Sequence, residues 1–262
     1  MLVDEGVARP DALGVTGVSY GGGQVQSLAR LRDRVRLRGG KLVRWRSPGG
    51  RPLRIAAAFS IIGWSDLTYA LVPNGRFLDF EDAEVAQSRR PLGIEKQSYV
   101  NGLYLVNRLR SYLARPGADP TADLTTWRRI SDAGEPYRAG ALRLARDLTV
   151  FHSAAGLGRV TAPLLLQSGF TDDLFPPEES LRVYRTVGRI PGAYVALQLG
   201  DLGHPRGGNK PNTRLYFNDQ GARFFDALLK RRGRAPRNRS VTAFTLTCPK
   251  GAPGGGPYRA RS

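Results

Sequence analysis

The sequence is poor in the residue types that build metal centres and covalent cross-links. Its 262 residues include one cysteine, Cys248, and two histidines, His152 and His204. A single cysteine excludes an internal disulfide and a cysteine-based metal site, and two histidines leave little material for a histidine-rich one. We therefore expect no metal and no other cofactor. Only two side chains could serve as an imidazole base near neutral pH.

Long apolar runs are also missing. No stretch approaches the roughly 20 apolar residues that a membrane-spanning helix needs. The residues after Met1 lack the basic and apolar regions of a signal peptide. We expect no membrane contact. The 41% hydrophobic content is that of a globular protein.

Acidic residues are few beside the basic ones. Forty Lys and Arg stand against 22 Asp and Glu, which gives a formal net charge of +18. A basic protein could bind nucleic acid, but the cations are scattered along the chain and no nucleic-acid-binding motif accompanies them. We interpret the charge as an arginine-rich composition and expect no nucleic-acid partner.

The chain is organised around Leu13–Gly23, LGVTGVSYGGG. A β-prone run ends in G-V-S-Y-G, and helix-permissive sequence follows over Gln24–Arg36. Strand, G-x-S-x-G and helix in succession are the context of a nucleophile elbow. Such a sharp turn needs small residues at Gly17 and Gly21, and it exposes the hydroxyl of Ser19 at a helix N-terminus. Glycine-flanked serines also occur in ordinary loops, so the motif needs support from elsewhere in the chain.

Further apolar runs of strand length alternate with helical patterns. The expected strands cover 54–62, 163–167 and 193–199, the expected helices 178–187 and 215–230, and an alternating pattern at 240–248 predicts one more strand. Strand, loop and helix in alternation with short connections are typical of a doubly wound, mostly parallel sheet. The sequence therefore predicts an α/β fold.

Residues 63–158 differ from the rest, because they contain helical patches and no comparable buried strand. We interpret them as a helical cap inserted in the sheet domain. Their aromatic side chains either line a substrate cleft or build the core of the cap: Trp64, Tyr69, Phe77, Phe80, Tyr99, Tyr104, Trp127 and Tyr137. The predicted organisation is a first core segment (1–62), the cap (63–158), a second core segment (159–232), and a linker with one strand of a further β domain (233–262).

Two loops that follow expected strands supply partners for Ser19. His204 follows the strand at 193–199, and the spacing Gly-x-x-Asp-x-x-Phe-Pro favours Asp172 as the acid. A serine hydroxyl needs a base to accept its proton, and a carboxylate holds the imidazole in the right tautomer. Asp173 is the competing acid and otherwise a turn or capping residue, and Asp201 is a weaker rival. The order Ser, Asp, His is that of the α/β-hydrolases, and His152 is expected to be structural.

Four motifs in one order carry a family resemblance: VTGVSYGGG, LVPNGRFLDF, SGFTDDLFPPEESLRVY and GDLGHPRG. Together they resemble the X-Pro dipeptidyl-peptidase and CocE/NonD group of α/β-hydrolases (peptidase family S15). The resemblance implies an α/β-hydrolase fold with a helical cap and a C-terminal β-sandwich. It also implies hydrolysis of a small-molecule ester or a peptide through an acyl-enzyme. Carried over by position, Ser19, Asp172 and His204 form the catalytic triad, and the backbone N–H of Tyr20 is one oxyanion donor.

In the family the first strands and a second oxyanion donor precede the nucleophile strand, whereas only about a dozen residues precede that strand here. We therefore expect a member truncated at both ends, which leaves the localisation open. The peptidase reading would need an acidic site for the substrate amine, for which Asp79, Glu81, Asp82 and Glu84 are candidates. The alternative function is an inactive hydrolase-fold fragment that acts as a binding or interaction domain. A homo-oligomer is compatible with either.

Overall fold

The computed structural model describes residues 1–37, 39–73, 92–110, 113–119, 122–134, 136–154, 157–158, 160–247 and 251–261. Its internal contacts divide the chain into two compact units. The first, here called the sheet unit, is Met1–Ser65 with Ala154–Ser262, and the second, the helical unit, is Asp66–Ser153. Residues 63–65 and 154–158, which the sequence analysis placed in the cap, thus belong to the sheet unit.

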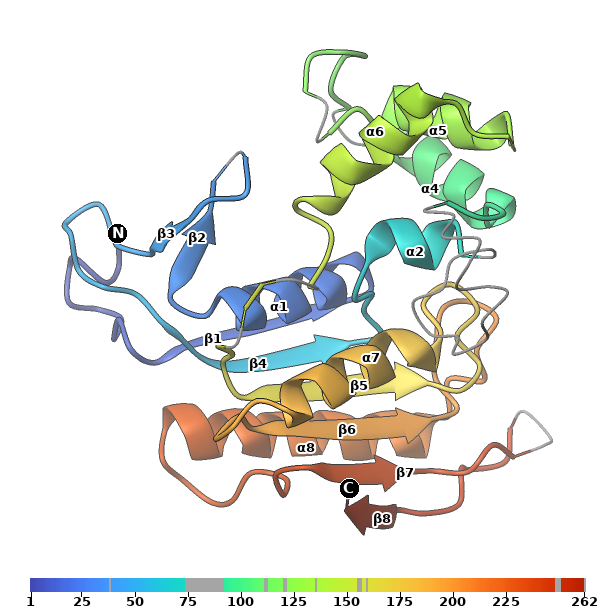
Figure 1. Ribbon diagram of the computed structural model, residues 1–262. Helices are drawn as coiled ribbons and strands as arrows, with labels where there is room; N and C mark the ends of the chain where they lie inside the picture. The colour runs from blue at the N-terminus through green and yellow to red at the C-terminus, as the bar shows by residue number, and fades with distance from the viewer. Residues whose placement is uncertain are drawn as a thin grey trace. The chain divides into compact units, whose positions relative to one another are not determined.

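The sheet unit is built on six strands in the order β1-β4-β5-β6-β7-β8 (Figure 1). Their bounds are β1 Leu13–Val18, β4 Ile55–Ile61, β5 Leu164–Gly169, β6 Val195–Gly200, β7 Ser240–Ala243 and β8 Tyr258–Arg261. The first five pair in parallel, and β8 runs antiparallel to β7. The carboxyl ends of β1, β5 and β6 therefore lie at the same end of the sheet.

Helices cover both faces of the sheet. Apolar residues of α1 (Tyr20–Leu31) and α7 (Pro177–Gly188) share a core with Leu164 and Leu166 of β5. The residue between them, Leu165, packs on the other face with Phe224 of α8 (Pro211–Leu229). Successive side chains of a strand point to opposite faces, so a continuous apolar run is required where both faces are covered. The predicted α/β class, with a doubly wound and mostly parallel sheet, is confirmed.

The helix predicted over 24–36 is shorter at its C-terminal end than the sequence indicated. Helix α1 ends at Leu31, and Arg32 takes a positive φ of 57°. Residues Arg34–Arg36 then form β2, which pairs with β3 (Leu42–Arg44) in an antiparallel ribbon. The apolar pattern of this stretch did not distinguish helix from strand. Periodicity does not indicate the positive φ at Arg32 or the pairing of Arg34–Arg36 with β3.

The strand predicted at 240–248 does not open a separate β domain in the structure. It is shorter than expected, and β7 pairs in parallel with β6 through Leu197–Val241, Gln198–Thr242 and Leu199–Ala243. Its side chain at Val241 joins the core between the sheet and α7. The alternating pattern predicted a strand correctly, but pattern alone does not state which neighbour a strand pairs with. Cys248 lies outside the described residues.

The described part of the helical unit contains α2 (Leu67–Leu71), α4 (Gln97–Arg110), α5 (Leu124–Asp132) and α6 (Ala139–Thr149). Asp66 and Asp123 cap α2 and α5, because their carboxylates accept hydrogen bonds from backbone N–H groups of the first turn. Of the predicted cap aromatics, Tyr69 and Trp127 are buried, which favours a core role for them. Phe77 and Phe80 lie outside the described residues.

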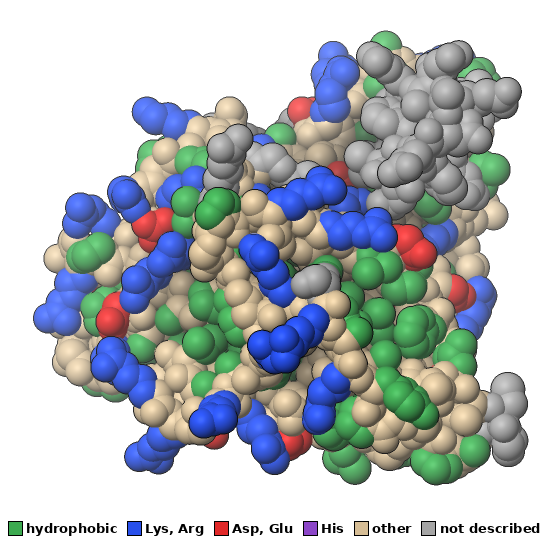
Figure 2. Space-filling model, turned by 60° about the horizontal axis from the view of Figure 1, so that its bottom comes forward, with side chains coloured by type: hydrophobic (Ala, Val, Ile, Leu, Met, Phe, Trp, Pro, Cys, Tyr) green, Lys and Arg blue, Asp and Glu red, His purple; other side chains and the backbone are tan. Residues whose placement is uncertain are grey.

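Lys and Arg side chains are spread across the face of the molecule shown in Figure 2, interspersed with apolar and acidic ones. Several of them pair with carboxylates, such as Arg44 with Asp33 and Arg223 with Asp219. Within the described ranges, no helix has the length and apolarity needed to cross a bilayer.

Candidate active site

Ser19 occupies the turn between β1 and α1 with a strained backbone. Its φ of 59° and ψ of −119° are unusual for a residue with a side chain. Its N–H donates to Ile61 O of the neighbouring strand at 2.9 Å, and its carbonyl accepts from Gly23 N at 3.1 Å. Strain of this kind persists only where the surroundings hold it and is concentrated at functional sites.

The glycines of the elbow are required for reasons that only partly match the prediction. A Cβ at Gly17 would lie 2.6 Å from Gly21 O, so that glycine is needed. A Cβ at Gly21 would meet nothing within 4 Å, so the prediction that Gly21 avoids a clash is wrong. The crowded positions are Gly22, 2.5 Å from Ile61 O, and Gly23, 2.1 Å from the indole of Trp64. These two glycines let α1 approach the end of β4.

His204 is in contact with Ser19 across 185 residues of sequence. Ser19 Oγ and His204 Nε2 are 2.7 Å apart. The other ring nitrogen, Nδ1, lies 2.9 Å from both carboxylate oxygens of Asp172. A carboxylate only accepts hydrogen bonds, so Nδ1 carries a proton, and the neutral imidazole presents a lone pair at Nε2 to the serine hydroxyl. The three side chains thus form one hydrogen-bonded chain.

Asp172 is held rigidly in the loop between β5 and α7. Its carboxylate is fully buried and accepts hydrogen bonds from the backbone N–H groups of Leu174, at 3.0 Å, and Phe175, at 2.9 Å. Buried polar groups need such partners, and here they fix the orientation of the carboxylate. The ring of Phe175 also packs edge-on against the imidazole of His204, with centroids 5.1 Å apart.

The two loops that carry Asp172 and His204 approach each other through glycines. A Cβ at Gly203 would lie 2.8 Å from the Cα of Asp172, and one at Gly169 would lie 1.7 Å from Leu202 O. Side chains at either position would push the loops apart. Gly203, next to His204 in the sequence, therefore allows the close approach of the two loops.

Asp201 does not contact the imidazole; its carboxylate holds the loop that carries His204. It accepts from the Thr171 hydroxyl at 2.7 Å and from Gly208 N at 2.9 Å. Asn209 adds a second clamp, since its side chain accepts from Gly203 N and donates to His204 O. The sequence pattern indicated neither interaction, since Asp201 was considered as a weaker candidate for the acid. The positive φ of 51° at Asn209 is one that Asn adopts readily in loops.

The competing candidates lie elsewhere. The Asp173 carboxylate pairs with Arg206 at 2.8 Å. It does not cap α7, whose N-cap position is Pro176. His152 belongs to the helical unit, where its Nδ1 is 2.7 Å from Leu148 O. Burial lowers the pKa of His152, while the Leu148 hydrogen bond and the charge of Asp66 oppose the shift.

Tyr20 follows Ser19 as the first residue of α1. The N–H groups of a first helical turn point out of the helix end, beyond the reach of intrahelical acceptors. The backbone N–H of Tyr20 therefore lies in the first turn after Ser19, at the positive end of the helix dipole. The tyrosine ring packs against Trp64 with centroids 5.9 Å apart, and burial raises the pKa of its hydroxyl. The ring thus closes one side of the elbow.

Metal ligands do not gather in this region. In the part of the chain that the structure describes, no group of three or more His, Cys, Asp or Glu side chains could hold a metal ion. What the site does offer is a hydroxyl, an imidazole and a buried carboxylate in series.

No family model matches the chain, and no curated protein matches it in sequence. Among solved structures it is similar to the Pyrococcus horikoshii acylaminoacyl peptidase, with 18% identity and a TM-score of 0.47 over 90% of this chain. It is also similar to esterase E22, with 16% identity and a TM-score of 0.38 over 86% of this chain. The chain spans 27% of the length of the first protein and 63% of the second.

Proposed function

We propose that this chain is a serine hydrolase that cleaves an ester or an amide through an acyl-enzyme. The observation that supports the proposal is the hydrogen-bonded series from Ser19 Oγ to His204 Nε2, at 2.7 Å, and from His204 Nδ1 to Asp172, at 2.9 Å. A serine hydroxyl is a weak nucleophile at its own pKa and is activated by an adjacent base. These distances fall within the range required for proton transfer.

The roles follow from the chemistry of the groups. His204 takes the proton of Ser19 as the hydroxyl attacks the carbonyl carbon, and Asp172 stabilises the imidazolium that forms. The same proton then passes to the leaving alcohol or amine as the tetrahedral intermediate collapses to an acyl-enzyme. Water, deprotonated by His204, then attacks the acyl group. The acid product leaves as the imidazolium returns that proton to Ser19 Oγ.

The developing negative charge on the carbonyl oxygen needs hydrogen-bond donors. We assign one of them to the backbone N–H of Tyr20, because it opens α1 directly after the nucleophile. A donor aimed at an oxyanion contributes about 3 kcal/mol to the stability of the transition state. The positive φ of 59° at Ser19 supports this role, since in a nucleophile elbow the N–H of the residue after the nucleophile contributes to the oxyanion hole.

Within this class we propose the acyl-esterase or X-Pro dipeptidyl-peptidase type that the sequence motifs resemble. The acidic residues considered for binding a substrate amine, Asp79, Glu81, Asp82 and Glu84, lie outside the described residues. The choice between ester and peptide therefore rests on substrates: p-nitrophenyl acetate and butyrate for the esterase, and a dipeptide Xaa-Pro p-nitroanilide for the peptidase.

The test is labelling by a fluorophosphonate, which reacts covalently with an activated serine. We expect the purified chain to be labelled and to turn over one of the chromogenic substrates, and Ser19→Ala to lose both. Ser27→Ala is the matched control, because Ser27 is buried on the same helix and, within the described part of the chain, its hydroxyl has no hydrogen-bond partner. That variant should label and turn over like the parent.

The outcomes of labelling and turnover distinguish the hydrolase from the alternative function. Labelling that persists in Ser19→Ala would reject the assignment of the nucleophile. A folded parent chain that neither labels nor hydrolyses would reject the hydrolase and favour the alternative function, an inactive domain that binds a partner. The unbroken series of three side chains supports hydrolysis over that alternative.

A further inference from the structure

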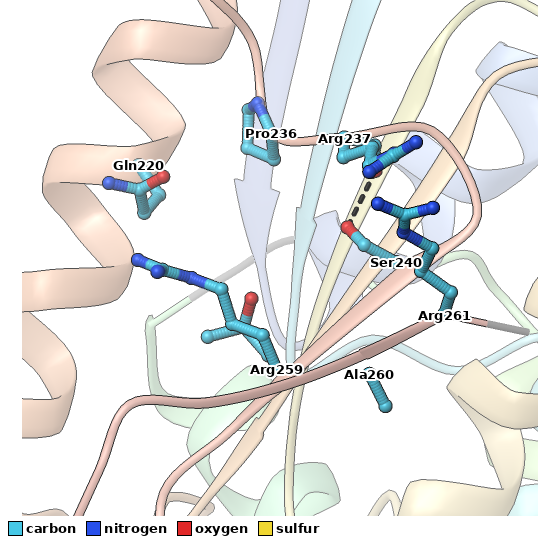
Figure 3. A pocket seen from close by; sticks show the side chains of 8 residues that line it. Gln220, Pro236, Arg237, Ser240, Arg259, Ala260 and Arg261 are labelled. Atoms are coloured by element: carbon cyan, nitrogen blue, oxygen red, sulfur yellow. Dashed lines mark hydrogen bonds between the residues drawn. The ribbon is translucent and has the colours of Figure 1, made fainter.

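A hollow of the sheet unit lies away from Ser19. It has a volume of about 400 Å³ and lies between α8, the segment after α8 and the β7–β8 ribbon (Figure 3). Its polar walls are formed by Gln220, Ser240, Thr242, Arg237, Arg259 and Arg261. Residues 237–240 lie at the amino end of β7, whereas the proposed triad lies at the carboxyl ends of β1, β5 and β6. The volume is within the range of small-molecule sites.

The strand register explains why two arginines share one wall. In the antiparallel pair, Ser240 lies opposite Arg261 and Thr242 lies opposite Arg259. Directly opposite residues, and residues two apart, point to the same face of a sheet. Val241, between them, packs on the α7 side, so these four side chains face the α8 side. The alternation R-A-R in β8 thus places two guanidinium groups at the hollow.

The three arginines are not neutralised by the protein. In the described part of the chain, none of Arg237, Arg259 and Arg261 forms an ion pair with a carboxylate. Arg259 donates to the hydroxyl of Tyr216 on α8 at 2.6 Å, an uncharged partner that positions it while leaving its positive charge uncompensated. This differs from Arg223 on the same helix, which pairs with Asp219.

Uncompensated like charges around one hollow repel each other, and a bound anion relieves the repulsion. Figure 3 shows Arg259 on the side of Gln220, and Arg237 with Arg261 on the other side. Guanidinium groups match the oxygen geometry of phosphate with paired hydrogen bonds. The hydroxyl of Thr242 also lines the hollow, whereas that of Ser240 already donates to Arg237 O. Three cations in a hollow of about 400 Å³ suit more than one anionic group.

We propose that this pocket binds a small phosphorylated compound with two or more phosphate groups. The small volume and the arginines on two sides of the hollow favour a small ligand over a nucleic acid, which would need a continuous basic surface. On the face shown in Figure 2, the basic side chains are dispersed. The site is separate from the proposed hydrolytic centre, and its occupation does not depend on that activity.

The test is titration calorimetry of the full chain with inorganic pyrophosphate at low ionic strength. We expect one site per chain, and at least tenfold weaker binding to the double variant Arg259→Ala/Arg261→Ala. The charge-matched control is Arg231→Ala/Arg234→Ala, which removes two exposed arginines outside the pocket. It should bind within twofold of the parent. Arg259→Lys/Arg261→Lys should fall between, because lysine keeps the charge and loses the paired geometry.

Circular dichroism of each variant checks that the fold is kept, and the Lys variant provides a second reading if the Ala variant unfolds. Equal weakening in the pocket and control variants would overturn the proposal, since net charge alone would then explain binding. Absence of pyrophosphate binding to the parent would overturn it too. Tighter binding of a short duplex DNA than of pyrophosphate, with affinity that falls steeply with salt, would assign the arginines to a nucleic-acid surface instead.

Discussion

The two histidines of this chain lie in two different units, and different groups contact their ring nitrogens. In the sheet unit, His204 has a serine hydroxyl at one ring nitrogen and a buried carboxylate at the other. In the helical unit, His152 contacts the carbonyl of Leu148, four residues earlier in the chain. The comparison teaches that the groups at the two nitrogens, and not the residue type, decide whether an imidazole can transfer a proton.

The largest expected difference in kcat between the two regions comes from removing each imidazole in turn. We expect His204→Gln to lower kcat by a factor on the order of 10⁵, because the nucleophile loses its base. His152→Gln should keep kcat within about twofold, since its Nδ1 contacts Leu148 O in the helical unit. The measurement is turnover of p-nitrophenyl acetate by both variants. Comparable losses in the two variants would contradict the assignment.

The neighbouring carboxylates Asp172 and Asp173 allow a similar comparison within the sheet unit. Asp172→Asn should lower kcat by about 10⁴-fold, because an amide that donates to Nδ1 favours the wrong tautomer of His204. Asp173→Asn removes the ion pair with Arg206, in which both side chains are at least one-third exposed, and we expect full activity because an exposed ion pair contributes little.

Because the Asp172 carboxylate accepts two backbone hydrogen bonds, the melting temperature of each variant must accompany the kinetics. An Asp172→Asn variant that stays folded and retains full turnover would show that the acid lies elsewhere.

The smallest effect concerns the pH dependence of stability in the helical unit. Burial lowers the pKa of His152 below its ordinary value of about 6.5. As pH falls through that value the unfolded chain binds a proton before the folded one, so His152 contributes a loss of stability on acidification. We expect the urea midpoint to fall less between pH 7.5 and pH 5.5 in His152→Gln than in the parent. Equal changes in the two proteins would rule out this contribution.

Much of the fold could be predicted because its signals are local. The apolar run RIAAAFSII predicts β4, and strand, G-x-S-x-G and helix predict the turn at Ser19. The errors arose where a distant partner decided the outcome. Arg34–Arg36 became a strand by pairing with β3, and β7 joined the sheet by pairing with β6. Neither partner is visible in the periodicity of the segment itself.

The sequence alone was enough to predict the residue types of the candidate site and their order: a serine at an elbow, an Asp-rich loop and a histidine loop, each at the end of an apolar strand. Which atoms meet became visible in the folded chain. It turned Asp172 toward His204 and Asp173 toward Arg206, and it used Asp201 to hold the loop. The physical reason is that parallel strands bring distant loops to one end of a sheet, where close backbone approach at Gly169 and Gly203 fixes each side chain.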